Sequence, residues 1–137
     1  MLLAVVGAHL SGQPLNGQLT QRGAALVTTT RTAPYYRLFA VPGTQPPKPG
    51  LVRARDKVGG SVEVEVWSMA EEAFGSFIGL VSAPLAIGQL ELEDGSRVHG
   101  FLCEPHAVEG ARDITSFGGW RAFLALGAQG GPAGGPP

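Results

Sequence analysis

The sequence predicts an α+β domain, a small, mixed and mostly antiparallel β-barrel with a few short helices. Most apolar runs are short and rich in β-branched and aromatic residues, as strands are. Turn-forming residues separate most of these runs, which favours antiparallel neighbours and a sheet that curls on itself. Helix signals are confined to a few short segments, and 137 residues give room for one domain with one core.

The first half of the chain is predicted to consist mainly of strands. Residues 16–23 have room for one helical turn that begins at Asn16, because asparagine caps helices well. The segment "PGTQPPKPG", residues 42–50, is predicted to be a loop, because proline cannot donate a hydrogen bond within a sheet. Strands are expected at residues 2–6, 25–30, 35–41 and 51–55.

Residues 61–69, "SVEVEVWSM", alternate between two faces as a strand does. One interpretation is an amphipathic strand with solvated glutamates. The other is a partly closed pocket, because a large aromatic side chain is seldom fully exposed, and a carboxylate there becomes an acid or base candidate. One face carries Val62, Val64 and Val66, and the other carries Glu63, Glu65 and Trp67.

The second half is predicted to contain a helix, a hairpin and a broken helical segment. The helix covers residues 70–77, and acidic residues in its first turn suit the helix dipole. The hairpin covers residues 85–104 and turns at Asp94-Gly95. The final segment, residues 113–127, is interrupted by Gly118-Gly119.

The chain is expected to divide into an ordered domain and a tail. We expect one domain over residues 1–126. Residues 127–137, "GAQGGPAGGPP", have little to bury and are predicted to be a flexible, disordered Gly/Pro-rich tail.

Composition argues against several classes of protein. The formal net charge is −1 and the lysines and arginines are scattered along the chain, so no nucleic-acid partner is expected. A membrane span needs roughly 20 unbroken apolar residues, and the sequence has no such run. Cys103 is the only cysteine, which excludes an internal disulfide and fits a cytoplasmic location.

No motif in the sequence predicts a metal or a cofactor. His99, Cys103 and His106 do not have the spacing of a zinc site. Glycines near the N-terminus do not form a phosphate-binding fingerprint, and no G-x-S-x-G nucleophile motif is present. We therefore expect neither a metal site nor a bound cofactor.

The first predicted strand ends at Gly7-Ala8-His9, which is either a plain turn or the edge of a ligand pocket. Two other residues are candidates for such a pocket. Arg37 offers a guanidinium group suited to a carboxylate, although a surface arginine is commoner. Trp120 follows a pair of glycines and is either a pocket wall or a packed core residue.

Several stretches together resemble the C-terminal domain of allophanate hydrolase over residues 3–126, and this domain is similar in fold to gamma-glutamyl cyclotransferases. The resemblance implies a substrate-holding loop at residues 7–10. It also implies His9 as a catalytic residue, with Gly7, Ala8 and Leu10 as substrate-binding residues. Together with the predicted strands, it implies Glu65 as a second catalytic residue and Tyr36, Arg37 and Trp120 as further substrate-binding residues. The matching stretches are "VVGAHLSGQPLN", "RTAPYYRLFAVPG", "PPKPGLVR", "VEVEVW", "FGSFIGLVSAPLAIGQLELEDGSRVHGFLCEP" and "DITSFGGWRAFLA".

The resemblance implies a role in urea and nitrogen metabolism with a small anionic carboxylate as substrate. In the family this domain is assigned the decarboxylation of N-carboxycarbamate. A chain of 137 residues cannot contain the amidase-signature domain, so it is not expected to hydrolyse allophanate alone. Residues 79–88 hold no carboxylate, which argues against cyclotransferase chemistry.

A non-catalytic role is the alternative that the resemblance leaves open. The chain would then be a partner or assembly subunit of a separate amidase-signature protein, and the loop at residues 7–10 would only bind a ligand. The composition also allows a homodimer, because a small and apolar domain often leaves an exposed apolar patch that a second copy can cover.

Overall fold

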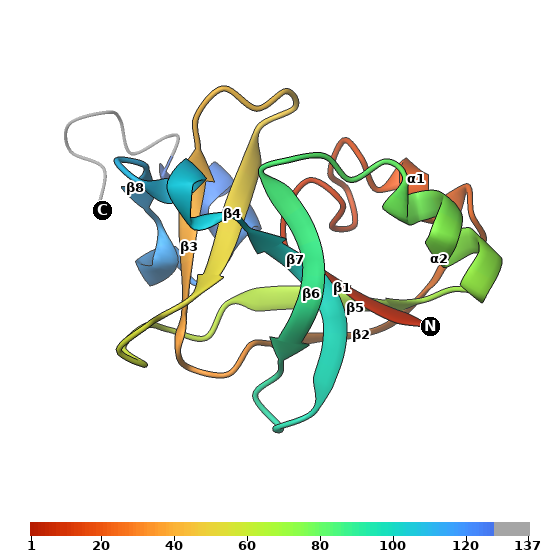
Figure 1. Ribbon diagram of the computed structural model, residues 1–137, viewed down its shortest axis with the longest axis horizontal. Coiled ribbons are helices and arrows are strands. Elements are labelled where there is room, and N and C mark those ends of the chain that lie inside the picture. The colour runs from red at the N-terminus through yellow and green to blue at the C-terminus, as the bar shows by residue number, and fades with distance from the viewer. Residues whose placement is uncertain (128–137) are drawn as a thin grey trace.

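The computed structural model describes residues 1–127, and Figure 1 shows how its strands and helices are arranged. The strands are β1 (Leu2–Val5), β2 (Ala25–Arg31), β3 (Tyr36–Val41), β4 (Lys48–Arg53), β5 (Glu63–Ser68), β6 (Leu85–Glu91), β7 (Arg97–Cys103) and β8 (Arg112–Asp113). The helices are α1 (Gly17–Thr20), α2 (Glu71–Ile78) and α3 (Trp120–Ala122). Two 3₁₀ turns, η1 (Pro105–Val108) and η2 (Thr115–Phe117), and a π-helical segment, η3 (Phe123–Gly127), complete the described elements.

The described strands form two sheets. The larger sheet has the strand order β2-β5-β1-β7-β6, and the smaller has the order β4-β3-β8. Every described strand pair is antiparallel except β1 with β7. The prediction of a mixed, mostly antiparallel α+β fold is confirmed. A closed barrel is not supported, because the described strands belong to two separate sheets.

β1 is the central strand of the larger sheet. It pairs antiparallel with β5 and parallel with β7, and Leu3 and Val5 are fully buried. The core also takes Leu38 from β3 and Leu51 from β4, so one hydrophobic cluster joins both sheets. This packing fixes the loop that leaves β1, which carries the predicted site.

Helices α1 and α2 lie together at one end of the larger sheet (Figure 1). The turn that follows α1 is joined to α2 by a hydrogen bond from Arg22 Nε to Ser76 Oγ of 3.1 Å. Both helices were predicted, with boundaries shifted by a few residues. No helix in the described part of the chain is long and apolar enough to cross a membrane.

The predicted loop at residues 42–50 is wrong at its C-terminal end. β4 begins at Lys48 and includes Pro49, which stands opposite Ala40 of β3. Proline is tolerated there because β4 is an edge strand of the smaller sheet. The backbone on the open side of an edge strand makes no hydrogen bonds to a neighbouring strand, so the missing N–H costs nothing. The strand predicted at residues 51–55 is therefore the second half of β4, which ends at Arg53.

β5 is covered on both of its faces. Val64 and Val66 on one face are buried, as is Val62 just before the strand. Glu65 and Trp67 on the other face are buried as well, while Glu63 is partly exposed. The solvated-glutamate interpretation is therefore wrong for Glu65, whose exposure is 2%.

The turn predicted at Asp94-Gly95 joins β6 to β7, and Gly95 has a φ of +88°. Gly118 has a φ of +86° and separates η2 from α3, so the predicted interruption is also confirmed. Gly127 ends η3, and the rest of the predicted tail, residues 128–137, lies outside the described residues.

Candidate functional site

The loop that follows β1 is buried and tightly hydrogen-bonded. Leu10 N donates to Gly7 O at 3.0 Å, and Leu15 N donates to Ala8 O at 2.8 Å. The Asn16 side chain donates to His9 O at 2.8 Å, so Asn16 holds this loop rather than capping α1 with its side chain. These bonds give the loop a single conformation at the exit of the central strand.

Gly7 lets β4 pass close to this loop. A Cβ atom at position 7 would overlap the ring of Pro49, which follows Lys48 in β4. A glycine is therefore needed to bring Lys48 beside the loop that carries His9.

His9 is enclosed by two aromatic rings. It is 8% exposed, its ring is stacked on Phe101 at 5.0 Å between centroids, and Phe77 meets it edge-on at 5.1 Å. Its Nε2 is 2.7 Å from Gln18 Oε1 of α1. Because an amide oxygen only accepts, this bond assigns the proton to Nε2 and leaves the Nδ1 lone pair free.

The surroundings of His9 favour its neutral form. Burial lowers the pKa of His9 below its ordinary value of 6.5, and the nearby Lys48 charge lowers it further. The hydrogen bond to Gln18 works in the opposite direction and does not overcome the burial.

His9 lines a hollow of about 190 Å³ that lies between α1 and the loops before β4 and β6. A narrow recess continues from it past Gly7 and Ala8 towards Pro49. A wider hollow of about 640 Å³ adjoins it and shares Gln45, Lys48, Ser82 and Leu85. Leu10, the last predicted residue of the loop, is fully buried and lines neither the hollow nor the recess.

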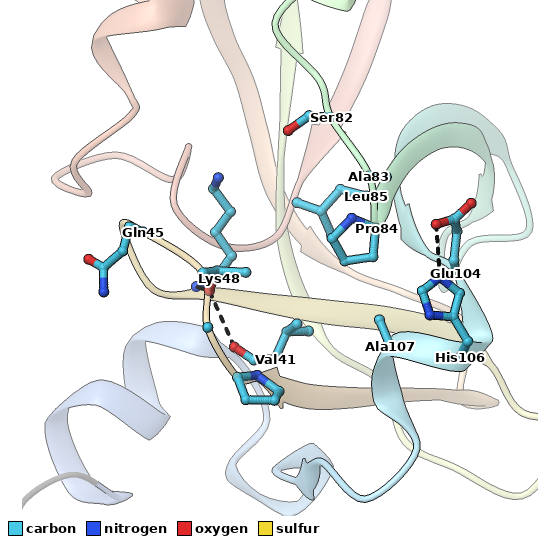
Figure 2. Close-up of a pocket in the computed structure, with 13 residues that line it drawn as sticks. Val41, Gln45, Lys48, Ser82, Ala83, Pro84, Leu85, Glu104, His106 and Ala107 are labelled. Carbon is cyan, nitrogen blue, oxygen red and sulfur yellow. Dashed lines mark hydrogen bonds and ion pairs between the residues drawn. The ribbon is translucent and has the colours of Figure 1, made fainter.

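Lys48 lines all three of these spaces. Figure 2 shows its side chain extending from β4 into the wider hollow, on the side of Ser82 and Leu85. Among residues 1–127, it is the only aspartate, glutamate, lysine or arginine that lines the hollow and the recess around His9. Within residues 1–127 its ammonium group has no hydrogen bond or ion pair, so it offers a free positive charge to a ligand.

Lys48 is not among the site residues predicted from the sequence. The sequence did contain a signal that could have indicated Lys48, because it is the only charged residue in the proline-rich segment 42–50. Gln18 and Phe101 were missed as well, since nothing in a single sequence shows that they meet His9.

Glu65 does not line the hollow or the recess around His9. Its Oε1 accepts hydrogen bonds from Ser11 N at 2.8 Å, Ser11 Oγ at 3.1 Å and Trp67 Nε1 at 3.1 Å. Its Oε2 accepts from Arg121 Nη1 at 3.1 Å. Burial alone would raise the pKa of Glu65, but these four donors outweigh it and hold the pKa below its ordinary value.

The other three predicted binding residues also lie outside the hollow around His9. Tyr36 is fully buried, and its hydroxyl accepts hydrogen bonds from Arg53 and from Glu91 N. Arg37 is paired with Asp113 at 2.9 Å. Trp120 is buried against Phe123.

The described residues show no cluster of three or more histidines, cysteines, aspartates and glutamates that could hold a metal ion. The described residues that line the hollow around His9 supply apolar groups, amides, one hydroxyl, an imidazole and an ammonium group, and no carboxylate. This donor set suits a small anion.

Comparison with known proteins identifies the family. A profile of the allophanate hydrolase C-terminal domain matches residues 1–125. The chain belongs to this family. It is 46% identical over 127 residues to urea amidolyase of Saccharomyces cerevisiae, covering 90% of this chain and 7% of that protein.

Solved structures show family members both within long chains and alone. Allophanate hydrolase of Kluyveromyces lactis is 42% identical with a TM-score of 0.86, over 90% of this chain and 21% of that one. A uropathogenic E. coli-specific protein is 36% identical with a TM-score of 0.82, over 90% of this chain and 94% of that one. Gamma-glutamyl cyclotransferase, at 17% identity and a TM-score of 0.54, shares the fold.

Proposed function

We propose that this member of the allophanate hydrolase C-terminal domain family decarboxylates N-carboxycarbamate, or a similar small carboxylated nitrogen compound, in the hollow around His9. The observation that carries the proposal is the pairing of an unpartnered Lys48 with a buried His9 in one hollow. The free ammonium group attracts a carboxylate, and the imidazole can carry a proton. We place this activity in urea and nitrogen metabolism in the cytoplasm.

The reaction needs one bond broken and one proton moved. The N–C bond to the departing carboxylate breaks, its electron pair stays on nitrogen, and CO2 leaves. The nitrogen takes up one proton, which gives carbamate. Lys48 holds the carboxylate that remains. Gln18 occupies Nε2 of neutral His9, so the free Nδ1 takes up a proton from water, helped by the negative charge of the bound substrate, and passes it to the nitrogen.

Apolar walls favour the loss of CO2. Phe101 and Leu85 line the hollow and offer no hydrogen bond to the departing carboxylate. A carboxylate that is poorly solvated on this side loses less when it becomes neutral CO2. The stabilising charges then stay with the carboxylate and nitrogen that form the product.

The remaining predicted residues contribute to the shape of the site. Gly7 and Ala8 line the recess behind His9, and Leu10 anchors the loop in the core. We propose that Glu65 acts through the loop rather than on substrate, because it binds Ser11, two residues after His9. We propose that Tyr36, Arg37 and Trp120 support the fold rather than bind substrate, because their side chains contact other protein groups outside the hollow.

The test measures CO2 release from allophanate in the presence of a purified amidase that supplies N-carboxycarbamate. We expect the protein to raise the rate above the uncatalysed release, and His9→Gln to abolish this increase. Lys48→Met removes the charge, whereas Lys48→Arg keeps it and should retain much of the activity. An unchanged rate in His9→Gln would contradict the proposal.

Malonate resembles N-carboxycarbamate but has CH2 in place of the nitrogen, so we expect it to bind without losing CO2. Its affinity therefore measures binding separately from the proton transfer. We expect Lys48→Met to weaken malonate binding at least about tenfold, as loss of a charged contact does. His9→Gln should bind malonate nearly as the wild type does. If the wild type accelerates nothing but co-elutes with the amidase, the non-catalytic partner role replaces the enzyme role.

A further inference from the structure

A second hollow, of about 380 Å³, lies away from the site around His9 and shares no lining residue with it. β4 begins at Lys48 and ends at Arg53, and β6 begins at Leu85 and ends at Glu91. The first residues of both strands line the site around His9, and their last residues line the second hollow. The two hollows therefore stand at opposite ends of β4 and β6, both labelled in Figure 1.

The second hollow collects positive charge that is scattered in the sequence. Arg53 and the turn after it contribute three cations, and the β6–β7 hairpin adds Arg97 from the opposite side. Glu91 is the one carboxylate that the described part of the chain contributes to the lining. The lining thus carries a net charge of +3 on a chain whose formal net charge is −1.

Three of the four cations are available to a ligand. Within residues 1–127, Arg55, Lys57 and Arg97 are exposed and have no hydrogen bond or ion pair of their side chains. Glu91 stands opposite Arg97 in the strand register without forming an ion pair with it. The Glu91 carboxylate instead faces Tyr35, where its hydrogen bond and charge raise the pKa of the phenol.

The fourth cation is held in a fixed orientation. Arg53 donates from Nη2 to the Tyr36 hydroxyl at 3.0 Å and lies over the Tyr36 ring at 5.5 Å from its centroid. A guanidinium group that is already oriented loses less freedom when it binds an oxyanion.

The backbone of the turn adds an independent observation. Lys57 has a φ of +60° and is the only non-glycine residue with positive φ in the described chain. This conformation costs a lysine about 1 kcal/mol, which glycine would avoid. Strained residues of this kind gather at binding sites.

We propose that this second hollow binds a small polyanion, a molecule with two or more phosphate or carboxylate groups. Its volume falls in the range of small-molecule sites. Three arginines supply forked donors that match the oxygens of both groups. A nucleic acid is disfavoured, because the residues outside the hollow carry a net negative charge that would repel a long phosphate chain.

The test titrates the full chain with diphosphate and, separately, with citrate at physiological ionic strength. Calorimetry gives the affinity, and NMR reports which residues respond. Saturable binding of either anion with responses at residues 53–57 and 97 supports the proposal. Binding of diphosphate alone identifies a phosphate ligand, and binding of citrate alone identifies a carboxylate ligand.

Variants decide whether the binding is specific. We expect Arg97→Gln to weaken the binding at least about tenfold, since it removes a charged contact. Arg31→Gln removes an exposed arginine outside the hollow and should leave the affinity unchanged. His9→Gln should also leave it unchanged, which separates this site from the proposed decarboxylation.

Three results would overturn the proposal: no saturable binding at millimolar concentration, equal losses in Arg97→Gln and Arg31→Gln, or tighter binding of an oligonucleotide than of diphosphate. Thermal unfolding of each variant checks that the fold is kept.

Discussion

His9 is a buried base whose charged form is disfavoured by the fold. Aromatic rings enclose it and Lys48 lies nearby, so its pKa is lowered from 6.5. In the unfolded chain the same imidazole is solvated and binds a proton near pH 6.5. This difference between the two states links the stability of the protein to pH.

We expect the free energy of unfolding to fall as the pH drops below 6.5. In this range His9 binds a proton in the unfolded chain but not in the folded protein. The slope contributed by this one group is about 1 kcal/mol per pH unit until the lowered pKa is reached. Chemical denaturation at several pH values should show this slope in the wild type. His9→Gln cannot titrate and should lose it, whereas an identical slope in both proteins would contradict the burial argument.

Glu65 and Glu63 share Arg121 but differ in burial, which makes them a matched pair. The Glu65 side chain is 3% exposed and the Glu63 side chain 30%. Glu65→Gln should cost about 3 kcal/mol of stability. Arg121 loses its buried carboxylate partner, and the NH2 group of the glutamine is a donor placed among other donors. Glu63→Gln should cost less than about 1 kcal/mol. Equal costs in urea denaturation would contradict this assignment.

At the scale of elements, the contact between the β1 loop and β4 decides whether Lys48 reaches His9. Gly7→Ala should cost about 1–3 kcal/mol, since a Cβ atom would collide with Pro49. It should also weaken malonate binding. Gly75→Ala in α2 is the control, because a Cβ atom there meets nothing within 4 Å. If Gly7→Ala is as stable as Gly75→Ala, the close approach is not required.

Local patterns predicted most of the elements. The alternation of β5, the turn at Asp94-Gly95 and the short helix α2 each follow from spacing within a few residues. The start of β4 could not be predicted, because Pro49 is tolerated only by virtue of its edge position, which depends on how distant segments pair.

The candidate site could be predicted only in part, because its residues come from segments that are distant in the sequence. His9 stands at the exit of a predicted strand, so its position was visible in the sequence. Lys48, Gln18 and Phe101 come from three other segments, and only the fold brings them to His9. Whether His9 and Glu65 act in catalysis stays a prediction.

At the scale of the whole molecule, one small domain carries two hollows of different character. The site around His9 is largely apolar with one free cation, and the second hollow is lined by four cations. The family match covers residues 1–125, and the single domain expected from the sequence stays a prediction. The chain spans 7% of its yeast relative and 94% of a bacterial one, so this unit occurs in very different settings.

The parallel pairing of β1 with β7 has a consequence for how the protein is made. Leu3 stands beside His99, so the first strand of this domain to be synthesised must wait for one of its last strands before the central sheet can form. Contacts between such distant parts of a chain slow folding. Until then the apolar edge of β1 is open to aggregation, and a chaperone that shields it during synthesis would raise the yield.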